Sequence, residues 1–182
     1  MQRIIVIGTS GSGKTTLAHQ LARQLDLPHI ELDALHWENG WAEAPEDVFL
    51  KRIYQAIEAD RWVIDGNHSR ARSIMWARAD TLIWLDYPRS LVMWRVFHRS
   101  LRRVITRQKL WNTDNTEGWR QTFFSRDSVI WWAWTTYDRR RREYPILIQQ
   151  PEYAHLTVLR FTMPYQTNRW LKTLSSPEST LL

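Results

Sequence analysis

The residues with the clearest chemical potential stand near the start of the chain, in the string GTSGSGKTT of residues 8–16. Its glycines allow backbone conformations that a Cβ atom would forbid, so that successive N–H groups can surround phosphate oxygens. Lys14 would neutralise the β- and γ-phosphate oxygens of a triphosphate, and the Thr15 hydroxyl would bind Mg²⁺. The string matches G-x-x-x-x-G-K-[ST] in full and predicts a site for ATP and Mg²⁺. The expected nucleotide-binding residues are Gly8, Thr9, Ser10, Gly11, Ser12, Gly13, Lys14, Thr15 and Thr16.

The surroundings of this string support the prediction. Residues 3–7 (RIIVI) are a short β-branched run, typical of a buried strand, and residues 14–25 carry leucines at helical spacing. A strand, a glycine-rich turn and a helix in this order place the positive end of the helix behind the phosphates. A turn without a ligand would require a chance match, which we expect in roughly one chain in a hundred of this length.

A magnesium triphosphate site also needs a carboxylate at the end of a neighbouring strand. Two candidates follow apolar runs, Asp65 in WVIDG and Asp86 in LIWLD. Hydrolytic enzymes with this loop commonly place a water-activating glutamate next, but here Gly66 and Tyr87 follow. The missing glutamate favours transfer of a phosphoryl group to a bound acceptor over hydrolysis.

The middle of the chain is rich in cations that such a transfer needs. The whole chain has 25 Lys and Arg against 19 Asp and Glu, and residues 89–142 alone hold 13 basic and four acidic side chains. A phosphoryl group in transfer spreads negative charge over its oxygens, so we expect arginines from this segment to contact it. For each of them a solvated surface position is the alternative. The expected catalytic arginines are Arg99, Arg103 and Arg126, from a pool that also includes Arg107 and Arg120.

The hydrophobic pattern alternates strands with helices, which predicts a parallel sheet covered on both faces. The expected strands are residues 3–7, 29–33, 61–65, 81–86 and 155–161. The expected helices are residues 14–25, a segment after Pro45, and residues 89–104, 125–143 and 164–174. We expect one domain over residues 1–174 with a lid at about 105–125, followed by a frayed tail at 175–182.

The helix at 89–104 has an apolar stripe that includes Trp94 and Phe97, and the stripe predicts its buried face. Trp62, Trp84 and Trp94 are expected in the core. Trp111 stands in the polar lid segment and is harder to explain as a core residue.

Composition excludes several classes of protein. The chain has no cysteine, which rules out disulfides, thiol nucleophiles, Cys-ligated zinc and iron–sulfur clusters. No stretch approaches the roughly 20 apolar residues of a membrane span. We expect a soluble, cytoplasmic protein that is a monomer or a homodimer and has no membrane partner.

Taken in order, these motifs resemble the adenylate-kinase-like P-loop kinases, most closely the bacterial group labelled DNA topology modulation or flagellar-regulation-related proteins. The likeness is carried by GTSGSGKTTLA, ELDALHW, WVIDGN, ADTLIWLDYPRSL and the arginine-rich helix before a Trp-bearing segment. It implies an α/β P-loop three-layer sandwich with a five-stranded parallel sheet in the order 2-3-1-4-5 and an arginine-rich lid. In that order the strand ending at Asp65 neighbours the first strand, which favours Asp65 over Asp86 as the metal carboxylate.

The resemblance is less exact on the acceptor side. Adenylate kinases carry D-G-F-P-R where this chain has DGNHSR at residues 65–70, and their phosphate-binding arginine after the second strand corresponds to His36. AMP is therefore not favoured as the acceptor. The string DALH at 33–36 resembles the D-x-L-H of gluconate-kinase-type enzymes, which implies that Asp33 faces the acceptor hydroxyl as a base. A capping role for Asp33 stays open. The expected substrate-binding residues are Asp33, His36, Trp37, Asn67 and Arg70.

Two functions follow from these observations. The first is a kinase that transfers the γ-phosphoryl group of Mg-ATP to a nucleotide or other small-molecule acceptor, with Lys14, Asp33 and the three arginines as catalytic residues. The second is a nucleotide-dependent regulator that binds DNA through the basic segment 89–142. The chain contains no recognisable DNA-reading module, so the kinase is the favoured reading.

Overall fold

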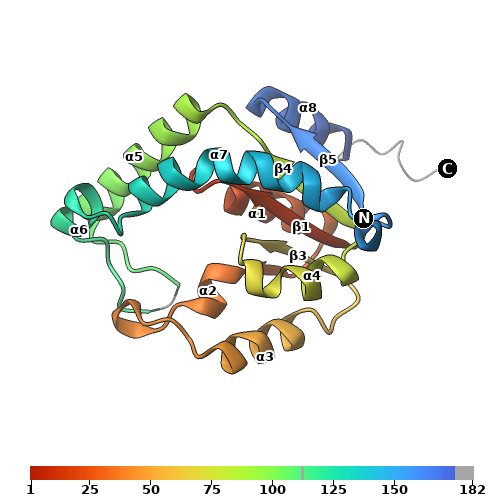
Figure 1. The fold of residues 1–182 in the computed structure, drawn as a ribbon, viewed down its shortest axis with the longest axis horizontal. Helices are drawn as coiled ribbons and strands as arrows, with labels where there is room; N and C mark the ends of the chain where they lie inside the picture. Colours follow the sequence, from red (N-terminus) through yellow and green to blue (C-terminus); the bar gives the residue numbers. More distant parts are fainter. Residues whose placement is uncertain (112, 175–182) are drawn as a thin grey trace.

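A parallel β-sheet forms the centre of the structure, a computed structural model that describes residues 1–111 and 113–174. The five strands lie in the order β2-β3-β1-β4-β5 (Figure 1). The expected fold class and strand order are confirmed, whereas the expected frayed tail at 175–182 lies outside the described residues. The strands are β1 (Arg3–Gly8), β2 (His29–Glu31), β3 (Trp62–Asp65), β4 (Thr81–Leu85) and β5 (Thr157–Phe161).

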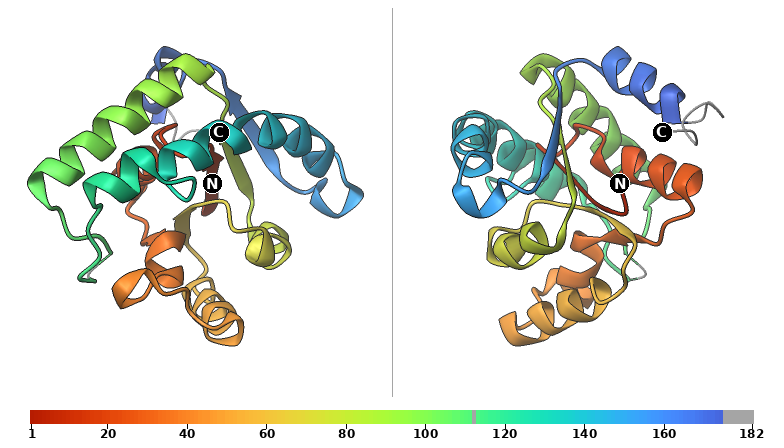
Figure 2. Two further views of the ribbon diagram at one scale, coloured as in Figure 1. Left: turned by 60° about the vertical axis from the view of Figure 1, so that its left-hand side comes forward. Right: turned by 90° about the vertical axis from the view of Figure 1, so that its right-hand side faces the viewer.

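Helices cover both faces of the sheet, as Figure 2 shows. Strand residues alternate between two apolar clusters, with Ile5 in one and Ile4 in the other. The first cluster includes residues of α3 and α4, the second includes residues of α1, α5 and α8, and α7 contributes to both. The helices are α1 (Lys14–Leu25), α2 (Leu32–His36), α3 (Glu46–Ala56), α4 (Arg72–Arg78), α5 (Arg89–Thr106), α6 (Trp119–Phe124), α7 (Val129–Ile148) and α8 (Pro164–Leu174). Within residues 1–111 and 113–174, none of them combines the length and apolar character that crossing a bilayer requires.

The register of the strands decides which side chains meet at their carboxyl ends. Val6 of β1 stands opposite Asp65 of β3, and Gly8 stands opposite Leu85 of β4. Because β1 and β3 are neighbours, Asp65 emerges beside the glycine-rich loop that follows β1. This loop, residues 8–16, is called the P-loop here.

The second strand is shorter than its sequence predicts. The run at 29–33 reads as extended, but β2 ends at Glu31, and Leu32 and Asp33 begin α2. Leu32 is buried against Gly66, where an added Cβ would lie 2.7 Å from the Leu32 Cβ. Gly66 has φ +141°, a conformation that side-chain-bearing residues rarely adopt. Tertiary packing therefore turns the chain into a helix and moves Asp33 from a strand onto α2.

The predicted buried stripe of the helix at 89–104 is wrong. In α5 the buried residues are Val92, Val96 and Ser100, while Trp94 is 60% exposed and Phe97 is 45% exposed. The reason is the close approach of α5 to the P-loop, where a Cβ added to Gly11 would lie 2.3 Å from Val96 Cγ2. Small side chains are needed at this contact, so the bulky aromatic residues of α5 face outward.

Two tryptophans provide a matched test of this arrangement. Trp62 is completely buried, as expected, whereas Trp94 is largely exposed. We predict that Trp62→Ala lowers the free energy of unfolding by about 3–5 kcal/mol, because it leaves a cavity in the core. Trp94→Ala should change it by no more than about 0.5 kcal/mol. Urea denaturation followed by circular dichroism measures both, and equal losses would contradict the orientation of α5.

Candidate functional site

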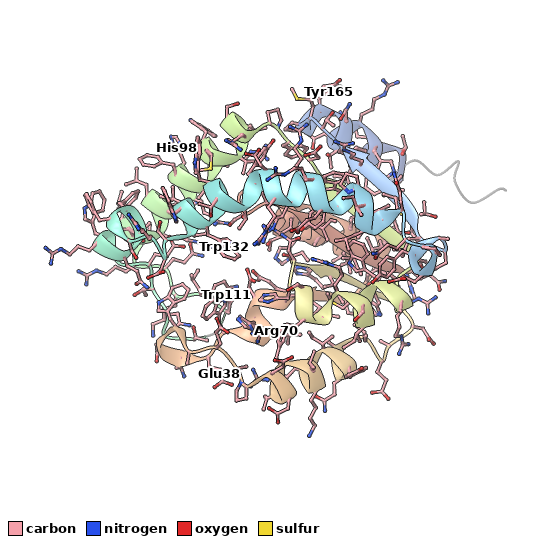
Figure 3. The ribbon with its side chains drawn as sticks, in the orientation of Figure 1. Glu38, Arg70, His98, Trp111, Trp132 and Tyr165 are labelled. Atoms are coloured by element: carbon pink, nitrogen blue, oxygen red, sulfur yellow. The ribbon has the colours of Figure 1, made fainter. Side chains whose placement is uncertain are left out.

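A large open cavity of about 1940 Å³ lies at the carboxyl ends of the strands. Its walls come from the P-loop, α2, α5, α7 and the segment after α5; in Figure 3, Trp132 of α7 and Trp111 lie at this space. Most of the expected site residues line this one cavity, whereas Gly8 and Thr9 are not among its lining residues. The expected residues that line it are Ser10 to Thr16, Asp33, His36, Trp37, Asp65, Asn67, Arg70, Arg99, Arg103 and Arg126.

The P-loop has the backbone conformation that its glycines predict. Gly8, Gly11 and Gly13 have φ values of +149°, +84° and +95°. A backbone hydrogen bond from Ser12 N to Thr9 O, at 3.0 Å, closes the loop. In the described part of the chain, the N–H groups of Gly11 and Gly13 donate to no protein acceptor. The loop therefore offers free donors at the start of α1, which suits an anion.

The side chain of Lys14 folds back onto the P-loop, where its burial disfavours the charged form. Its Nζ donates to Thr9 O at 3.3 Å. Burial, followed by the charge of Arg140, lowers the pKa of Lys14 to about 8, and the negative charges of Asp65 and Asp33 offset only part of this shift. A bound anion would stabilise the charged form of Lys14 and raise its pKa again.

Thr15 and Asp65 form the pair expected for a metal ion. The Thr15 hydroxyl donates to Asp65 Oδ1 at 3.0 Å, and His29 Nε2 lies 2.7 Å from Asp65 Oδ2. Among the described residues no group of three or more His, Cys, Asp and Glu could hold a metal by itself. One hydroxyl and one carboxylate fit Mg²⁺, which is usually bound by few protein ligands together with water and phosphate oxygens.

Asp86, the second carboxylate candidate, is engaged elsewhere. Its side chain is 3% exposed and pairs with Arg141, at 3.0 Å, and with Arg160. Neither arginine belongs to the P-loop or α5. The structure thus separates the two carboxylates as the strand order predicts, and only Asp65 contacts the P-loop.

Two arginines of α5 contact the P-loop directly. Arg95 Nη1 donates to Ser12 O at 3.2 Å, and Arg99 Nη2 donates to Ser10 Oγ at 3.1 Å. Burial and, to a smaller extent, the positive charge of Arg103 lower the pKa of Arg99 to about 10. Arg95 was not among the residues expected from the sequence, although its spacing of four from Arg99 puts both on one helix face.

The other expected arginines are placed differently. Arg103 pairs with Glu117 at 2.9 Å, so its charge is partly neutralised, and Arg126 is exposed at the cavity. Arg107 and Arg120 are exposed and are not part of the lining. Arg139 and Arg140 of α7 also line the cavity, although nothing in the run of arginines at 139–142 distinguishes them by sequence.

Asp33 of α2 lines the same cavity as the P-loop. It accepts a hydrogen bond from His68, with Nε2 3.1 Å from Asp33 Oδ1. Burial by itself raises the pKa of Asp33, but the hydrogen bond from His68 and the charges of His68 and Lys14 outweigh it and hold the pKa below its usual value. Asp33 is therefore an ionised carboxylate in the neutral pH range.

Asn67, expected to contact a substrate, is bound to the P-loop. Its Oδ1 accepts from Gly8 N at 3.2 Å and its Nδ2 donates to Gly8 O. Arg70 stands exposed near the cavity with Glu46 3.7 Å away. The amide of Asn67 thus fixes the start of the P-loop relative to β3, while Arg70 is free to turn toward a ligand.

Tryptophans form a wall next to Asp33. The rings of Trp37 and Trp111 are stacked with centroids 6.4 Å apart and an interplanar angle of 16°, and Trp41 meets Trp111 edge-on. Trp111 Nε1 donates to Glu31 Oε1 at 2.9 Å. The stacked rings of Trp37 and Trp111 belong to residues 74 positions apart, so no local pattern in the sequence could predict their contact.

The segment that follows α5 is tied to the turn after α2. Asn115 is 2% exposed, accepts from Trp41 N at 2.9 Å and donates to Glu38 O at 2.7 Å. Trp41 Nε1 in turn donates to Thr116 O at 3.3 Å. This part of the expected lid therefore lies against the turn after α2 in the structure.

A family model described as an AAA domain matches residues 4–117. The chain belongs to this AAA domain family. The match to the AAA domain includes the P-loop, Asp33, Asp65 and α5, and it ends before α7 begins. Arg140 consequently lies outside the part of the chain that defines the family.

Solved structures of small-molecule kinases share the fold of this AAA domain protein. Shikimate kinase from Acinetobacter baumannii, in complex with shikimate, aligns with a TM-score of 0.60 and 13% identity, covering 96% of this chain and 90% of that one. Shikimate kinase from Bacteroides thetaiotaomicron gives 0.54 and 16%, covering 95% and 96%. A gluconokinase from Sinorhizobium meliloti 1021 gives 0.50 and 17%, covering 96% and 93%. At these identities the likeness establishes the fold alone.

The lowered pKa of Lys14 predicts a pH-dependent stability. Its pKa is about 8 in the folded chain against 10.5 ordinarily, so the unfolded chain binds more protons between these values and stability should rise with pH across this window. Lys14→Met should therefore melt at a higher temperature than the wild type at pH 7, and the difference should shrink by pH 10. Thermal melts at both pH values measure it.

Lys51→Met is the matched control, because Lys51 is exposed on α3. Its melting temperature should follow the wild type at both pH values. A gap between Lys14→Met and wild type that stays constant from pH 7 to pH 10 would show that the ammonium group is not destabilised in the fold.

Proposed function

We propose that this protein is an ATP-dependent kinase that transfers the γ-phosphoryl group of Mg-ATP to a hydroxyl group of a small-molecule acceptor. The observation that carries the proposal is the presence, in one cavity, of the Lys14 loop, the Thr15–Asp65 pair and the ionised Asp33. The fold shared with shikimate kinases and a gluconokinase supports it. The narrower resemblance to the topology modulation group stays a prediction.

The P-loop would bind the nucleotide. Free N–H groups of Gly11 and Gly13, with the start of α1 behind them, would bind the phosphate oxygens, and Lys14 would pair with the β- and γ-phosphates. Thr15 and Asp65 would hold Mg²⁺, which neutralises charge on the phosphate oxygens when bound. This arrangement explains why Lys14 has a lowered pKa in the chain alone.

Arginines would stabilise the charge on the phosphoryl group in transfer. Arg99 is the strongest candidate, because it already contacts Ser10 of the P-loop. Arg140 is added to the group expected from the sequence, because its charge acts on Lys14. Arg103 and Arg126, which flank the proposed lid at residues 105–125 and line the cavity, would add positive charge around the phosphates.

The acceptor would bind between α2 and the tryptophan wall. Asp33 would accept the proton of the attacking hydroxyl, and the aromatic face of Trp37 would pack against the acceptor skeleton. His36 is buried, and its pKa is lowered by burial and by the nearby charge of His68, so it would act as a neutral wall of the pocket. Arg70 would pair with an acidic group of the acceptor.

The alternative of a DNA-binding regulator has less support. Six arginines of the basic segment line the cavity and so lie where a small anionic ligand would bind: Arg95, Arg99, Arg103, Arg126, Arg139 and Arg140. DNA affinity that falls steeply with salt, together with no acceptor-dependent release of ADP, would favour the regulator.

Replacing Lys14 tests the nucleotide site. We expect Lys14→Ala to weaken ATP binding about 100-fold, because a charge-assisted contact with the phosphates is lost. Isothermal titration calorimetry with Mg-ATP measures the affinity, and circular dichroism checks the fold. Lys51→Ala should bind as the wild type does, and unchanged affinity in Lys14→Ala would refute the proposed site.

Replacing Asp33 tests the acceptor side. Release of ADP is first screened with nucleoside monophosphates, nucleosides, sugars and small acids as acceptors. With the acceptor that is found, Asp33→Asn should lower kcat by about 10²- to 10⁴-fold, because the amide cannot take the hydroxyl proton, while the affinity for ATP stays the same. Turnover of this variant at the wild-type rate would show that Asp33 is not the base.

A further inference from the structure

His68 is the direct protein partner of the Asp33 carboxylate. His68 follows β3 and Asp33 lies on α2, and the two side chains meet at 3.1 Å. Both line the cavity, and 24% of the His68 side chain is exposed. Within the described part of the chain the second carboxylate oxygen of Asp33 has no hydrogen-bond partner, so it is available to a ligand.

The His68 ring is held in place by aromatic packing. Its centroid lies 5.1 Å from that of Phe49, in an edge-on arrangement, and 4.4 Å from that of His36. Phe49 is 1% exposed and itself packs edge-on against His36. Because two buried rings support the imidazole, its Nε2 has a fixed direction toward Asp33.

His36 does not perform the same task. Its Nε2 lies 3.8 Å from Glu43, and its Nδ1 is buried and has no hydrogen-bond partner among the described residues. It therefore backs the His68 ring but does not bind Asp33. The two histidines of this pocket therefore differ: His36 packs against the ring of His68, and His68 donates a hydrogen bond to Asp33.

We propose that His68 is a positioning residue for phosphoryl transfer, whose Nε2–H holds one oxygen of Asp33 so that the other faces the acceptor hydroxyl. This inference rests on the proposed kinase function. The acceptor oxygen forms its bond to the γ-phosphorus while the bond from that phosphorus to the β–γ bridging oxygen breaks, which leaves ADP. The hydroxyl proton passes to the free oxygen of Asp33 and later to water, and His68 keeps its own proton throughout.

The charges around Asp33 determine what removal of His68 would do. Without the imidazole, the hydrogen bond that opposes the effect of burial would be lost, and the pKa of Asp33 would rise. A base must be deprotonated to act, so the fall in activity at low pH would begin at a higher pH. The other titratable groups that act electrostatically with Asp33 are Lys14, Glu31, His36, Arg99 and Arg140.

Three variants test the proposal by steady-state kinetics. His68→Ala should lower kcat about tenfold or more, leave the acceptor KM within about threefold, and move the acid limb of the pH profile upward. His68→Gln, whose side-chain amide can donate to Asp33, should recover most of both effects. His98→Ala is the control, because His98 is exposed on the side of α5 away from the cavity (Figure 3).

A readout without turnover separates this inference from the kinase proposal. The Asp33 carboxyl carbon, assigned in ¹³C NMR by its loss in Asp33→Asn, should titrate at a higher pH in His68→Ala than in the wild type. An unshifted titration, or a loss of kcat in His68→Ala with no movement of the acid limb, would overturn the positioning role. A wild type that releases no ADP with any acceptor would refute the kinase function, and the carboxyl titration would still decide whether His68 holds Asp33.

Discussion

The tight packing of α5 on the P-loop is the constraint on which the rest of the structure depends. Gly11 can approach Val96 only because it has no Cβ, and Val96 can fill the contact only because it is small. This contact fixes the rotation of α5 about its axis, which turns Arg95 and Arg99 toward the loop. The same rotation leaves Trp94 in solvent. One steric requirement thus decides both where the cations lie and which aromatic side chains are exposed.

The site is also defined by an imbalance of charge. Burial disfavours the charged forms of Lys14 and Arg99, and the positive charge of Arg140 adds to the effect at Lys14. Asp65 and Asp33 offset only part of this cost. A polyanion would relieve it, so ligand binding and folding stability are thermodynamically linked through these side chains. Such a preorganised group of cations is costly in the free protein and effective once the anion is bound.

Local patterns predicted much of the architecture and the nucleotide side of the site. The P-loop motif and the strands ending near Asp65 and Asp86 could be inferred from local patterns, because parallel strands place their carboxyl ends at one edge. The position of Asp65 beside the P-loop followed from the strand order that the family resemblance implied. The orientation of α5 could not be inferred, because a helix with apolar residues on more than one face gives no unique buried side. The contact of His68 with Asp33 could not be predicted from the sequence either, since it depends on how the loop after β3 packs against α2.

The stacked pair of Trp37 and Trp111 gives the molecule a built-in optical marker. Two indoles this close interact through their transition dipoles, and the resulting exciton coupling contributes to the ultraviolet circular dichroism. Because the partners come from segments far apart in sequence, the signal depends on the tertiary contact between the segment after α2 and the segment after α5. Separation of these rings would therefore be visible spectroscopically without any label attached to the protein.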